Sequence, residues 1–415
     1  MIGNELMRLA LPILDTLNRD YEAVFVGGCV RDLLLGDDVT DVDIATSALP
    51  EQVMALFPRT LPTGLQHGTV TVVTEQGHYE VTTYRKESAY EQFRRPGSVE
   101  FIPSLTEDLR RRDFTINALA MRADGTLVDP FGGQEDLARR VVRCVGDPDA
   151  RLQEDALRML RGIRFAARLG AEIEAETWQA MLRHRQLLRH IAMERVGVEL
   201  DKMVGGAHPA AAIRLLAASG LLTCAKEPLF IADKLSDADV STLHAIESVD
   251  ARWSALCILA GLDAPSAADL LRTLRYAVRR ADAVSAAVAF HQRATAMSGC
   301  EEETIREAWV RAIIDIGRPA AALWLDMLEA GLLPAVDRVP GPVQLRQWLD
   351  ELYPATLKEL ALGGDEVQQL LERRPGPWMK SLLQRLLVAA ALGRVHNTKE
   401  ALAAYVLSCE GEELS

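Results

Sequence analysis

The pattern of apolar and polar positions divides the chain into an N-terminal α/β part and a longer helical part. Short apolar runs, AVFVGG (23–28) and DVDIAT (41–46), predict buried strands, and two β-rich runs about a polar turn at 68–85 predict a hairpin. From about residue 134 onward, nearly every segment is helical and rich in Leu, Ala and Arg. The pattern therefore predicts an α+β chain with its strands near the N-terminus.

Three helices are predicted within the α/β part. Residues 1–24 form an amphipathic helix that leads into a strand, and the early acidic residues are not typical of a signal peptide. VRDLLLG (30–36) fits two helical turns that end at Gly36. SALPEQVMALF (47–57) begins with a Ser cap and a proline, which predicts a third helix.

The composition is that of an ordinary folded protein. Of the 415 residues, 49% are in the hydrophobic set and 25% are charged, and the length predicts two to four domains. No apolar run approaches the roughly 18 residues that a membrane helix requires. The six cysteines are scattered without a CxxC pair, which favours neither a disulfide framework nor a zinc site. We therefore expect no membrane association and a cytoplasmic location.

The overall charge argues against a nucleic-acid partner. The formal net charge is −13 and the pI is about 5.2, whereas phosphate binding usually leaves a basic footprint. A local basic patch can still bind phosphate within an acidic protein. Whether a nucleic acid is a partner therefore has to be judged from the motifs.

Two aspartates stand two residues apart at the start of a predicted strand. Alternate residues of a strand point to the same face, so Asp41 and Asp43 project together while Val42 and Ile44 face the core. Such a pair suits Mg²⁺ and two-metal phosphoryl transfer, in which the ions lie about 3.5–4 Å apart. An acidic turn that caps the next helix would place aspartates here too, and the pair alone does not separate the two interpretations.

The segment upstream favours the metal interpretation. FVGGCVRD (25–32) is a strand, a Gly-Gly turn and a helix start, where backbone N–H groups can meet a phosphate. Arg31 adds a permanent cation near the same place. A Gly-Gly turn alone is common, but its combination with a following arginine and with DxD on the next strand is much rarer.

GGCVRD followed by DVDIAT resembles the signature of the polymerase-beta-type nucleotidyltransferases, specifically the class II tRNA nucleotidyltransferases. The resemblance is collinear and strong over roughly residues 20–205 and is looser beyond them. Four further motifs carry it: RRDFTINALA (111–120), DPFGG (129–133), EDALRMLRGIRFAARLG (154–170) and ERVGVEL (194–200). It implies a nucleotidyltransferase head with a mixed β-sheet, then an all-α neck, body and tRNA-binding tail, with these boundaries: 1–138, 139–205, 206–325 and 326–415.

The resemblance also implies the roles of the motif residues. Asp41 and Asp43 would bind the catalytic metal ions, with Mg²⁺ as the cofactor, and Gly28 and Arg31 would contact the triphosphate. The 3′-hydroxyl of an RNA would attack the α-phosphate and release pyrophosphate. Arg112 matches a further nucleotide contact.

Two other residues have open roles. Glu80 is a candidate third carboxylate, although an exposed position on a hairpin would explain it equally well. Asn117 of the RRDFTINALA motif fits a structural role better than a nucleotide contact.

The segment 154–169 carries four arginines on one side of an ideal helix. With 3.6 residues per turn, one arc holds Arg158, Arg161, Arg164 and Arg168. A solvated amphipathic helix would show the same arc, but four arginines without a lysine favour planar, bidentate recognition. Phe165 breaks the pattern, and we expect it to pack against a neighbouring helix.

Asp155 and Arg158, three residues apart, are expected to lie side by side on this helix. An acceptor beside a forked donor matches cytosine and adenine, which offer an exocyclic amine and a ring nitrogen. Uracil and guanine place a carbonyl where the amine would be, and a site built on buried hydrogen bonds rejects such mismatches strongly. The pair therefore predicts selection of CTP and ATP without a nucleic-acid template. In the family this is the EDxxR motif, here with Glu154, and Arg161 and Arg164 match further nucleotide contacts.

The helical remainder would hold the tRNA. Four arginines just before the selecting helix are candidates for phosphate contacts, although each alone is more often a solvated surface charge: Arg139, Arg140, Arg143 and Arg151. Basic residues in the last third are too dispersed to form a predicted patch.

Members of the family add CCA, CC, A or poly(A). In the family, full CCA addition depends on a flexible loop, which here is the polar segment 84–103 with Arg94-Arg95-Pro96. Its full length favours CCA addition to the 3′ end of tRNA over CC addition, while A addition stays open. A poly(A) polymerase is disfavoured because the chain ends in the acidic CEGEELS.

Two other classes of protein share parts of the pattern. A nucleotidyltransferase for a protein or a small molecule would also have GG and DxD, and an RNA- or nucleotide-binding protein could keep a degenerate head. The arginine helix argues against the first class. The intact Asp41 and Asp43 argue against the second.

Overall fold

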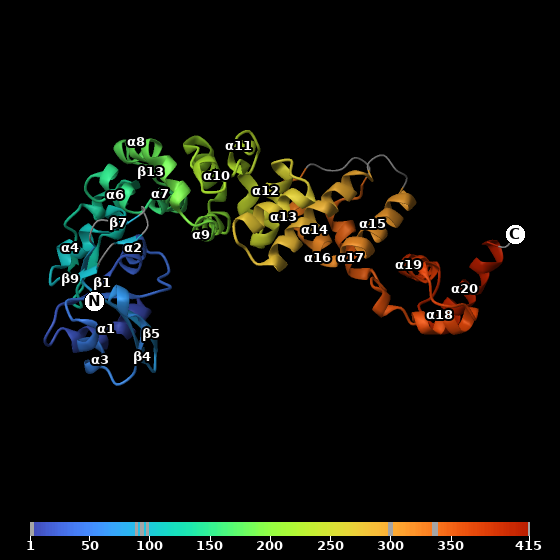
Figure 1. The fold of residues 1–415 in the computed structure, drawn as a ribbon, viewed down its shortest axis with the longest axis horizontal. Helices are drawn as coiled ribbons and strands as arrows, with labels where there is room; N and C mark the ends of the chain where they lie inside the picture. Colours follow the sequence, from blue (N-terminus) through green and yellow to red (C-terminus); the bar gives the residue numbers. More distant parts are fainter. Residues whose placement is uncertain are drawn as a thin grey trace. The chain divides into compact units, whose positions relative to one another are not determined.

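The chain divides into two compact units, Met1–Ser236 and Asp237–Ser415 (Figure 1). The structure is a computed structural model, and it describes residues 4–87, 90–91, 95–96, 99–297, 302–333 and 339–413. All nine predicted site residues belong to the first unit. The fold of that unit therefore determines their geometry.

A mixed seven-stranded sheet forms the base of the first unit. Strands β2 and β5 run parallel, and the other neighbours are antiparallel. In sheet order the strands are β11 (Leu127–Val128), β10 (Ala120–Met121), β1 (Ala23–Val26), β2 (Asp43–Thr46), β5 (Gly77–Thr83), β4 (Thr69–Thr74) and β3 (Thr60–Gly64). The predicted mixed sheet is confirmed, and the predicted hairpin is β4 with β5.

Strand β2 brings acidic residues next to β5. The parallel register pairs Asp43 with Glu80, so the two carboxylate side chains start from adjacent positions. The strand begins at Asp43, and the prediction that it begins at Asp41 was two residues too long. Exposure still alternates across this boundary, because Asp41 and Asp43 are exposed while Val42 and Ile44 are buried.

The turn between β1 and helix α2 (Gly28–Leu35) requires glycine. Gly27 has a φ of +71°, and a side-chain carbon at this position would lie 2.6 Å from a guanidinium nitrogen of Arg112. Helix α2 ends, as predicted, at Gly36 in the left-handed conformation. The tight turn places Gly28 in the wall of the cleft described below.

Short helices and two small strand pairs complete the head, and a third strand pair follows it in the chain. Ser47 does not cap α3 as predicted, because its hydroxyl accepts a hydrogen bond from the Glu22 N–H at 3.0 Å. The helices are α1 (Glu5–Leu17), α3 (Pro50–Leu56), α4 (Leu105–Arg110) and α5 (Gly133–Ala138), with 3₁₀ turns at Leu65–His67 and Thr115–Asn117. The strand pairs are β6 (Arg85–Glu87) with β9 (Val99–Phe101), β7 (Tyr90–Glu91) with β8 (Arg95–Pro96), and β12 (Val141–Val142) with β13 (Glu172–Ile173).

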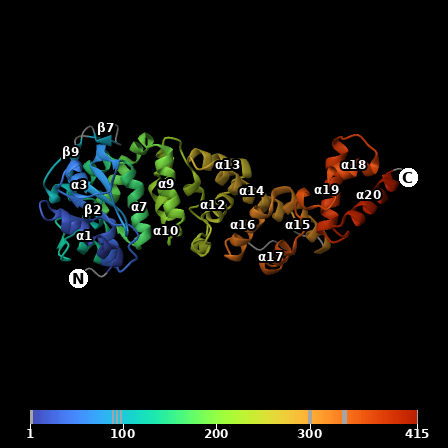
Figure 2. The ribbon, with the colours of Figure 1, turned by 90° about the horizontal axis from the view of Figure 1, so that it is seen from below.

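A group of helices follows the head within the first unit. Helix α7 packs against both α9 and α10 (Figure 2). The helices are α6 (Pro148–Glu154), α7 (Leu157–Leu169), α8 (Ala175–His184), α9 (Met193–Val204), α10 (Pro209–Ser219) and α11 (Ile231–Lys234), with 3₁₀ turns at Arg185–His190 and Leu222–Cys224. The predicted selecting helix is therefore split, since α6 ends at Glu154 and α7 begins at Leu157.

The described residues of the second unit contain helices and connecting turns. Its core includes Phe290, Trp309 and Trp324, whose ring centroids lie 5.2–5.9 Å apart. The helices are α12 (Val249–Leu259), α13 (Ala264–Thr273), α14 (Val278–Thr295), α15 (Glu302–Ile316), α16 (Arg318–Glu329), α17 (Pro342–Glu351), α18 (Gly364–Leu371), α19 (Pro377–Ala391) and α20 (Lys399–Glu413), with 3₁₀ turns at Ser241–Ala245 and Leu357–Glu359. The predicted helical remainder is confirmed.

Within the described part of the chain, no helix combines the length and the apolar character that crossing a membrane would require.

Candidate active site

One cleft in the first unit collects most of the predicted site residues. Its volume is about 570 Å³, which is typical of a small-molecule site. Nine arginines and three aspartates line it, so a strongly cationic cleft exists in this acidic protein. Eight of the nine predicted residues line it: Gly28, Arg31, Asp43, Arg112, Asp155, Arg158, Arg161 and Arg164.

The ninth residue, Asp41, belongs to what we call the acidic edge, which consists of Asp41, Asp43 and Glu80. Asp43 lines the cleft and also a smaller cavity of about 180 Å³ that includes Glu80. Partial enclosure raises the pKa of the Asp43 carboxyl, the Arg112 guanidinium opposes this shift, and the Asp41 carboxylate adds to it. The two aspartates therefore lie close enough to repel each other, and a bound cation would relieve that repulsion.

The donor set of the acidic edge fits a hard divalent cation. Carboxylate oxygens are the ligands that Mg²⁺ prefers, and this ion usually keeps several ligands from water or substrate phosphates. Among the described residues, no three side chains of His, Cys, Asp or Glu are grouped so that they could hold a metal by themselves. Water or phosphate oxygens would therefore supply the rest of the coordination.

Arg31 is a buried cation held in a fixed orientation. Its side chain is 4% exposed, and two of its nitrogens donate to the Asp32 carboxylate, at 2.9 Å and 3.1 Å. The remaining terminal nitrogen donates to the Asn117 side-chain oxygen. Such a pre-oriented guanidinium at the Gly28 turn can bind a phosphate without first being ordered.

Asn117 connects this arginine to the middle of the cleft. Its amide nitrogen donates to Asp113 Oδ1 at 3.0 Å, and Arg161 forms an ion pair with Asp113 Oδ2 at 2.7 Å. Burial alone would raise the pKa of the Asp113 carboxyl, but the Arg161 guanidinium and the Asn117 amide hold it well below its ordinary value. These contacts give Asn117 the structural role that its motif suggested.

The arginines of α7 form what we call the arginine wall: Arg158, Arg161, Arg164 and Arg168. Each has a carboxylate partner on another element or at the end of α6. The ion pairs are Arg158 with Glu154 at 2.5 Å, Arg161 with Asp113 at 2.7 Å, Arg164 with Glu199 at 2.6 Å and Arg168 with Asp32 at 3.1 Å. These ion pairs therefore fix the orientation of the guanidinium groups of the wall.

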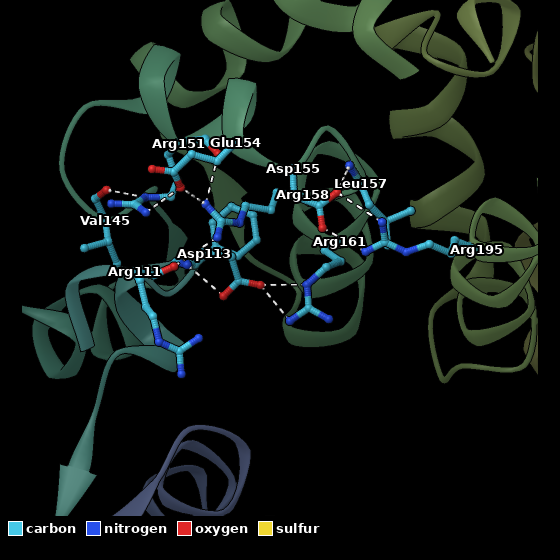
Figure 3. A network of polar contacts seen from close by, with 11 residues as sticks. Arg111, Asp113, Val145, Arg151, Glu154, Asp155, Leu157, Arg158, Arg161 and Arg195 are labelled. Atoms are coloured by element: carbon cyan, nitrogen blue, oxygen red, sulfur yellow. Dashed lines mark hydrogen bonds and ion pairs between the residues drawn. The ribbon is translucent and has the colours of Figure 1, made fainter. Parts of the chain in front are cut away.

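Arg158 is the most buried arginine of the wall, at 8% exposed. Glu154 bridges Arg158 and Arg151, with nitrogen–oxygen distances of 2.5 Å and 2.6 Å (Figure 3). Arg158 also donates to the backbone carbonyls of Arg151 and Arg111, each at 3.0 Å. Glu154 thus positions the arginine that the EDxxR motif assigns to base recognition.

Asp155 lies in the break between α6 and α7, and the prediction that it lies on one helix with Arg158 was wrong. Its backbone is extended, with φ −139° and ψ 105°, and its carboxylate accepts the Leu157 N–H at the start of α7. Arg195 of α9 contacts both carboxylate oxygens, at 2.8 Å and 3.4 Å (Figure 3). Asp155 and Arg158 nevertheless line the same cleft, so both can reach one base.

Sequence reasoning missed the parts played by Arg195 and Phe165. Phe165 does not simply pack against a helix as predicted: it lines the cleft, with its ring 6.0 Å from Phe114. Three guanidinium carbons lie over the ring, those of Arg31 at 5.1 Å, Arg161 at 5.4 Å and Arg164 at 4.2 Å. In the sequence, the interruption of the polar arc at Phe165 was the signal for a role of this residue in the cleft. The ERVGVEL motif was the signal for Arg195.

Other predicted residues lie at the margin of the site or outside it. Arg94 and several neighbours in the 84–103 loop lie outside the described residues, so the loop argument stays a prediction. Three of the four proposed phosphate contacts have acidic partners, which are Glu135 for Arg139, Asp136 for Arg143 and Glu154 for Arg151.

The chain matches three family models in succession. The Poly A polymerase head domain matches residues 23–143, the RNA and SrmB-binding site of polymerase A matches 170–225, and tRNA nucleotidyltransferase domain 2 matches 244–406. The first match contains the acidic edge and the Gly28 turn. The order of the three agrees with a catalytic head followed by helical RNA-associated parts.

Whole-length relatives identify the family. The chain is 41% identical over 396 residues to the CCA-adding enzyme of Geobacillus sp. (strain WCH70), covering 94% of each chain, and 37% identical over 425 residues to that of Anoxybacillus flavithermus (strain DSM 21510 / WK1), covering 99% of each. The crystal structure of Bacillus stearothermophilus CCA-adding enzyme in complex with CTP has a TM-score of 0.85 to this fold, at 36% identity and 99% coverage of both chains. The resemblance seen in the motifs is thereby confirmed, and the chain belongs to the CCA-adding enzymes, a family of tRNA nucleotidyltransferases.

Proposed function

We propose that this protein adds CCA to the 3′ end of tRNA, using CTP and ATP and releasing pyrophosphate. The observation that carries the proposal is a single cleft lined by Asp43 of the acidic edge and by Asp155 and Arg158. One group of side chains can transfer a nucleotide, and the other can select it. The whole-length relatives named CCA-adding enzymes support this choice over other nucleotidyl transfers.

Base selection would take place where Asp155 and Arg158 meet. Asp155 can accept the exocyclic amine of cytosine or adenine, while Arg195 holds its carboxylate from the other side. Arg158 can donate to the ring nitrogen while Glu154 and two carbonyls fix its guanidinium plane. A carbonyl in place of the amine would face the Asp155 carboxylate with no proton between them, so UTP and GTP would bind poorly.

The triphosphate would lie between the Gly28 turn and the arginine wall. Arg31, Arg161 and Arg164 converge on Phe165 from α2 and α7, and each is already oriented by a carboxylate. Pre-oriented cations can neutralise the charge that develops on the leaving pyrophosphate without reorganising. Arg112, which forms an ion pair with Asp108 at 3.6 Å, would contact the nucleotide from the head.

Asp41 and Asp43 would hold Mg²⁺ at the acidic edge, and Glu80 would complete the group from β5. Divalent ions bound there supply activation of the RNA 3′-hydroxyl and neutralisation of the phosphate oxygens. The protein's own contribution is to place Asp43 of β2 beside Glu80 of β5 in the parallel register, with Asp41 in the turn before β2. Repulsion between these carboxylates favours the binding of cations at the edge and disfavours a further anionic side chain there.

The remaining assignments follow from this activity. We place the head at 1–138, the selecting neck at 139–205, the body at 206–325 and a tRNA-binding tail at 326–415. The site of action would be the cytoplasm, where tRNA ends are processed.

Product length tests the proposal. Purified protein receives Mg²⁺ and tRNA that lacks its last three nucleotides, with CTP, ATP or both, and the products are resolved on a sequencing gel. Growth by two with CTP alone and by three with both nucleotides is the expected result. A stop at two with both would make the protein a CC-adding enzyme, and addition only to tRNA that already ends in CC would make it an A-adding enzyme.

A further inference from the structure

A second cavity of about 420 Å³ adjoins the nucleotide cleft. Its nine lining residues are Arg164, Ala167, Arg168, Lys202, Met203, Gly205, Gly206, Ala207 and His208. Arg164 and Arg168 also line the nucleotide cleft, so the two spaces share these two side chains. The lining residues of the second cavity come from α7, from the end of α9 and from the turn before α10. Helix α7 packs against both of the other helices (Figure 2).

The charges of this cavity favour an anion. Its lining contains four basic side chains and no acidic one. Lys202, in the last turn of α9, and His208, which precedes α10, are both exposed, and neither has an ion pair with another described residue. This differs from the arginine wall, where every cation already has a carboxylate partner. Lys202 and His208 can therefore bind a ligand without giving up an internal ion pair.

The position along α7 indicates which anion this cavity receives. Arg158 lies at the base-selecting end, Arg164 lies with Arg31 at the Phe165 ring, and Arg168 lies one turn further on. At 1.5 Å per residue, Arg158 and Arg168 are about 15 Å apart along the helix. The second cavity therefore lies beyond the triphosphate end of the proposed substrate and away from the base.

The in-line geometry of the reaction distinguishes two anions that could reach this cavity, the phosphate of the RNA end and the pyrophosphate leaving group. In nucleotidyl transfer the attacking oxygen and the leaving group are roughly in line on opposite sides of the phosphorus. The RNA end must reach the acidic edge at Asp43, whereas the second cavity adjoins Arg168, whose partner Asp32 also holds Arg31. The leaving group is thus on the same side of the reacting phosphate as this cavity.

We propose that the second cavity is a binding site for pyrophosphate as it leaves the nucleotide cleft. Arg164 and Arg168 are shared by both spaces and would pass the anion from Arg31 to Lys202 and His208. The lining also includes the apolar side chains of Ala167, Met203 and Ala207, which carry no charge that could compete for these groups. This inference rests on the proposed function, because pyrophosphate is the product of that reaction.

The test compares the wild type with a Lys202→Gln/His208→Gln double variant. Inhibition of nucleotide addition by added pyrophosphate should weaken about fivefold to tenfold, because the charge-assisted contact of Lys202 and the hydrogen bond of His208 are lost. The KM for CTP should stay within about twofold, since neither residue lines the nucleotide cleft. Lys226→Gln is the matched control, because Lys226 is an exposed lysine of the same unit that lines neither cavity.

Unchanged inhibition by pyrophosphate would overturn the proposal. A raised KM for tRNA with unchanged inhibition would also overturn it and would assign the cavity to the RNA backbone. Calorimetric titration of inorganic pyrophosphate into nucleotide-free protein separates this inference from the activity. The wild type should bind two per chain and the double variant one, whereas equal binding would contradict the inference even if the protein adds CCA.

Discussion

The arginine wall and Asp43 of the acidic edge line the same cleft, but the wall and the edge are built in opposite ways. Every arginine of the wall has a carboxylate partner within about 3.1 Å, supplied by α6, α9 or the head. At the acidic edge, burial raises the pKa of the Asp43 carboxyl, the Arg112 guanidinium opposes this shift without cancelling it, and the Asp41 carboxylate adds to it. The arginines of the wall are paired with carboxylates of the protein, whereas the carboxylates of the edge would be paired with bound cations.

This difference corresponds to the two tasks of the proposed function, the selection of the base and the transfer of the nucleotide. In the proposed function, selection between bases depends on a fixed arrangement of donors and acceptors, and the ion pairs with Glu154 and Arg195 would supply that rigidity. The proposed chemistry depends on cations that arrive with the substrate, and two neighbouring carboxylates would bind them. Changes at the edge should therefore alter rate, and changes at Asp155 and its partner Arg195 should alter the choice of base.

The largest effect is expected at the acidic edge. Asp43→Ala should lower the rate of nucleotide addition by about 10³-fold or more, because loss of a metal ligand removes several kcal/mol of transition-state stabilisation. The fold should survive, since the side chain is exposed. Single-turnover assays would measure the rate and circular dichroism the fold. Asp38→Ala, at an exposed aspartate of the preceding turn, is the control, and comparable activity of the two variants would exclude the metal assignment.

The next effect concerns base choice. Asp155→Ala should lower the preference for CTP over UTP by about 10²-fold, because an acceptor that excludes the uracil carbonyl is lost. The assay is kcat/KM for each of the four nucleotides on the same tRNA. Unchanged discrimination at an unchanged rate would move base recognition to other residues.

A smaller effect is expected from the partner of Asp155. Arg195→Gln should lower kcat/KM for CTP by about tenfold and reduce discrimination in part, because the Asp155 carboxylate loses its two-point support. Arg195→Lys should restore some of the loss by keeping the charge. Arg189→Gln, at an exposed arginine on the neighbouring 3₁₀ turn, is the control. A loss of rate with full discrimination would show that Arg195 does not act through Asp155.

The smallest effect is on stability against acid. The pKa of Asp113 is depressed in the folded protein, so its contribution to stability is present above the ordinary aspartate value of about 3.9 and is lost as the pH falls below it. Asp113→Asn should therefore lower the urea midpoint at pH 6, and the difference from the wild type should shrink below about pH 4. A difference that does not depend on pH would contradict the assigned ion pair with Arg161.

The sequence was sufficient to predict the local elements of this site. Short apolar runs predicted β1, the Gly28 turn and β2, because these features depend on neighbouring residues, although β2 begins two residues later than predicted. The helical arc of arginines predicted the wall for the same reason. Even the error at Asp155 was local, since the residue's extended backbone interrupts a pattern that is otherwise periodic through the break.

Long-range partners could not be predicted in this way. Arg195 is 40 residues from Asp155, and Asp113 is 48 residues from Arg161. Periodicity describes which face of a helix a residue occupies, but it does not state which other helix faces it. The second cavity is a similar case, because it exists only where α7, α9 and α10 pack together.

The most direct test of the separation between wall and edge is nucleotide binding by Asp43→Ala. Equilibrium binding of CTP, ATP, UTP and GTP would be measured with Mg²⁺ and without RNA, for this variant and for the wild type. We predict that the variant no longer adds nucleotides yet still prefers CTP and ATP to the same degree as the wild type. A variant that loses this preference together with its activity would contradict the account, because selection would then depend on the acidic edge.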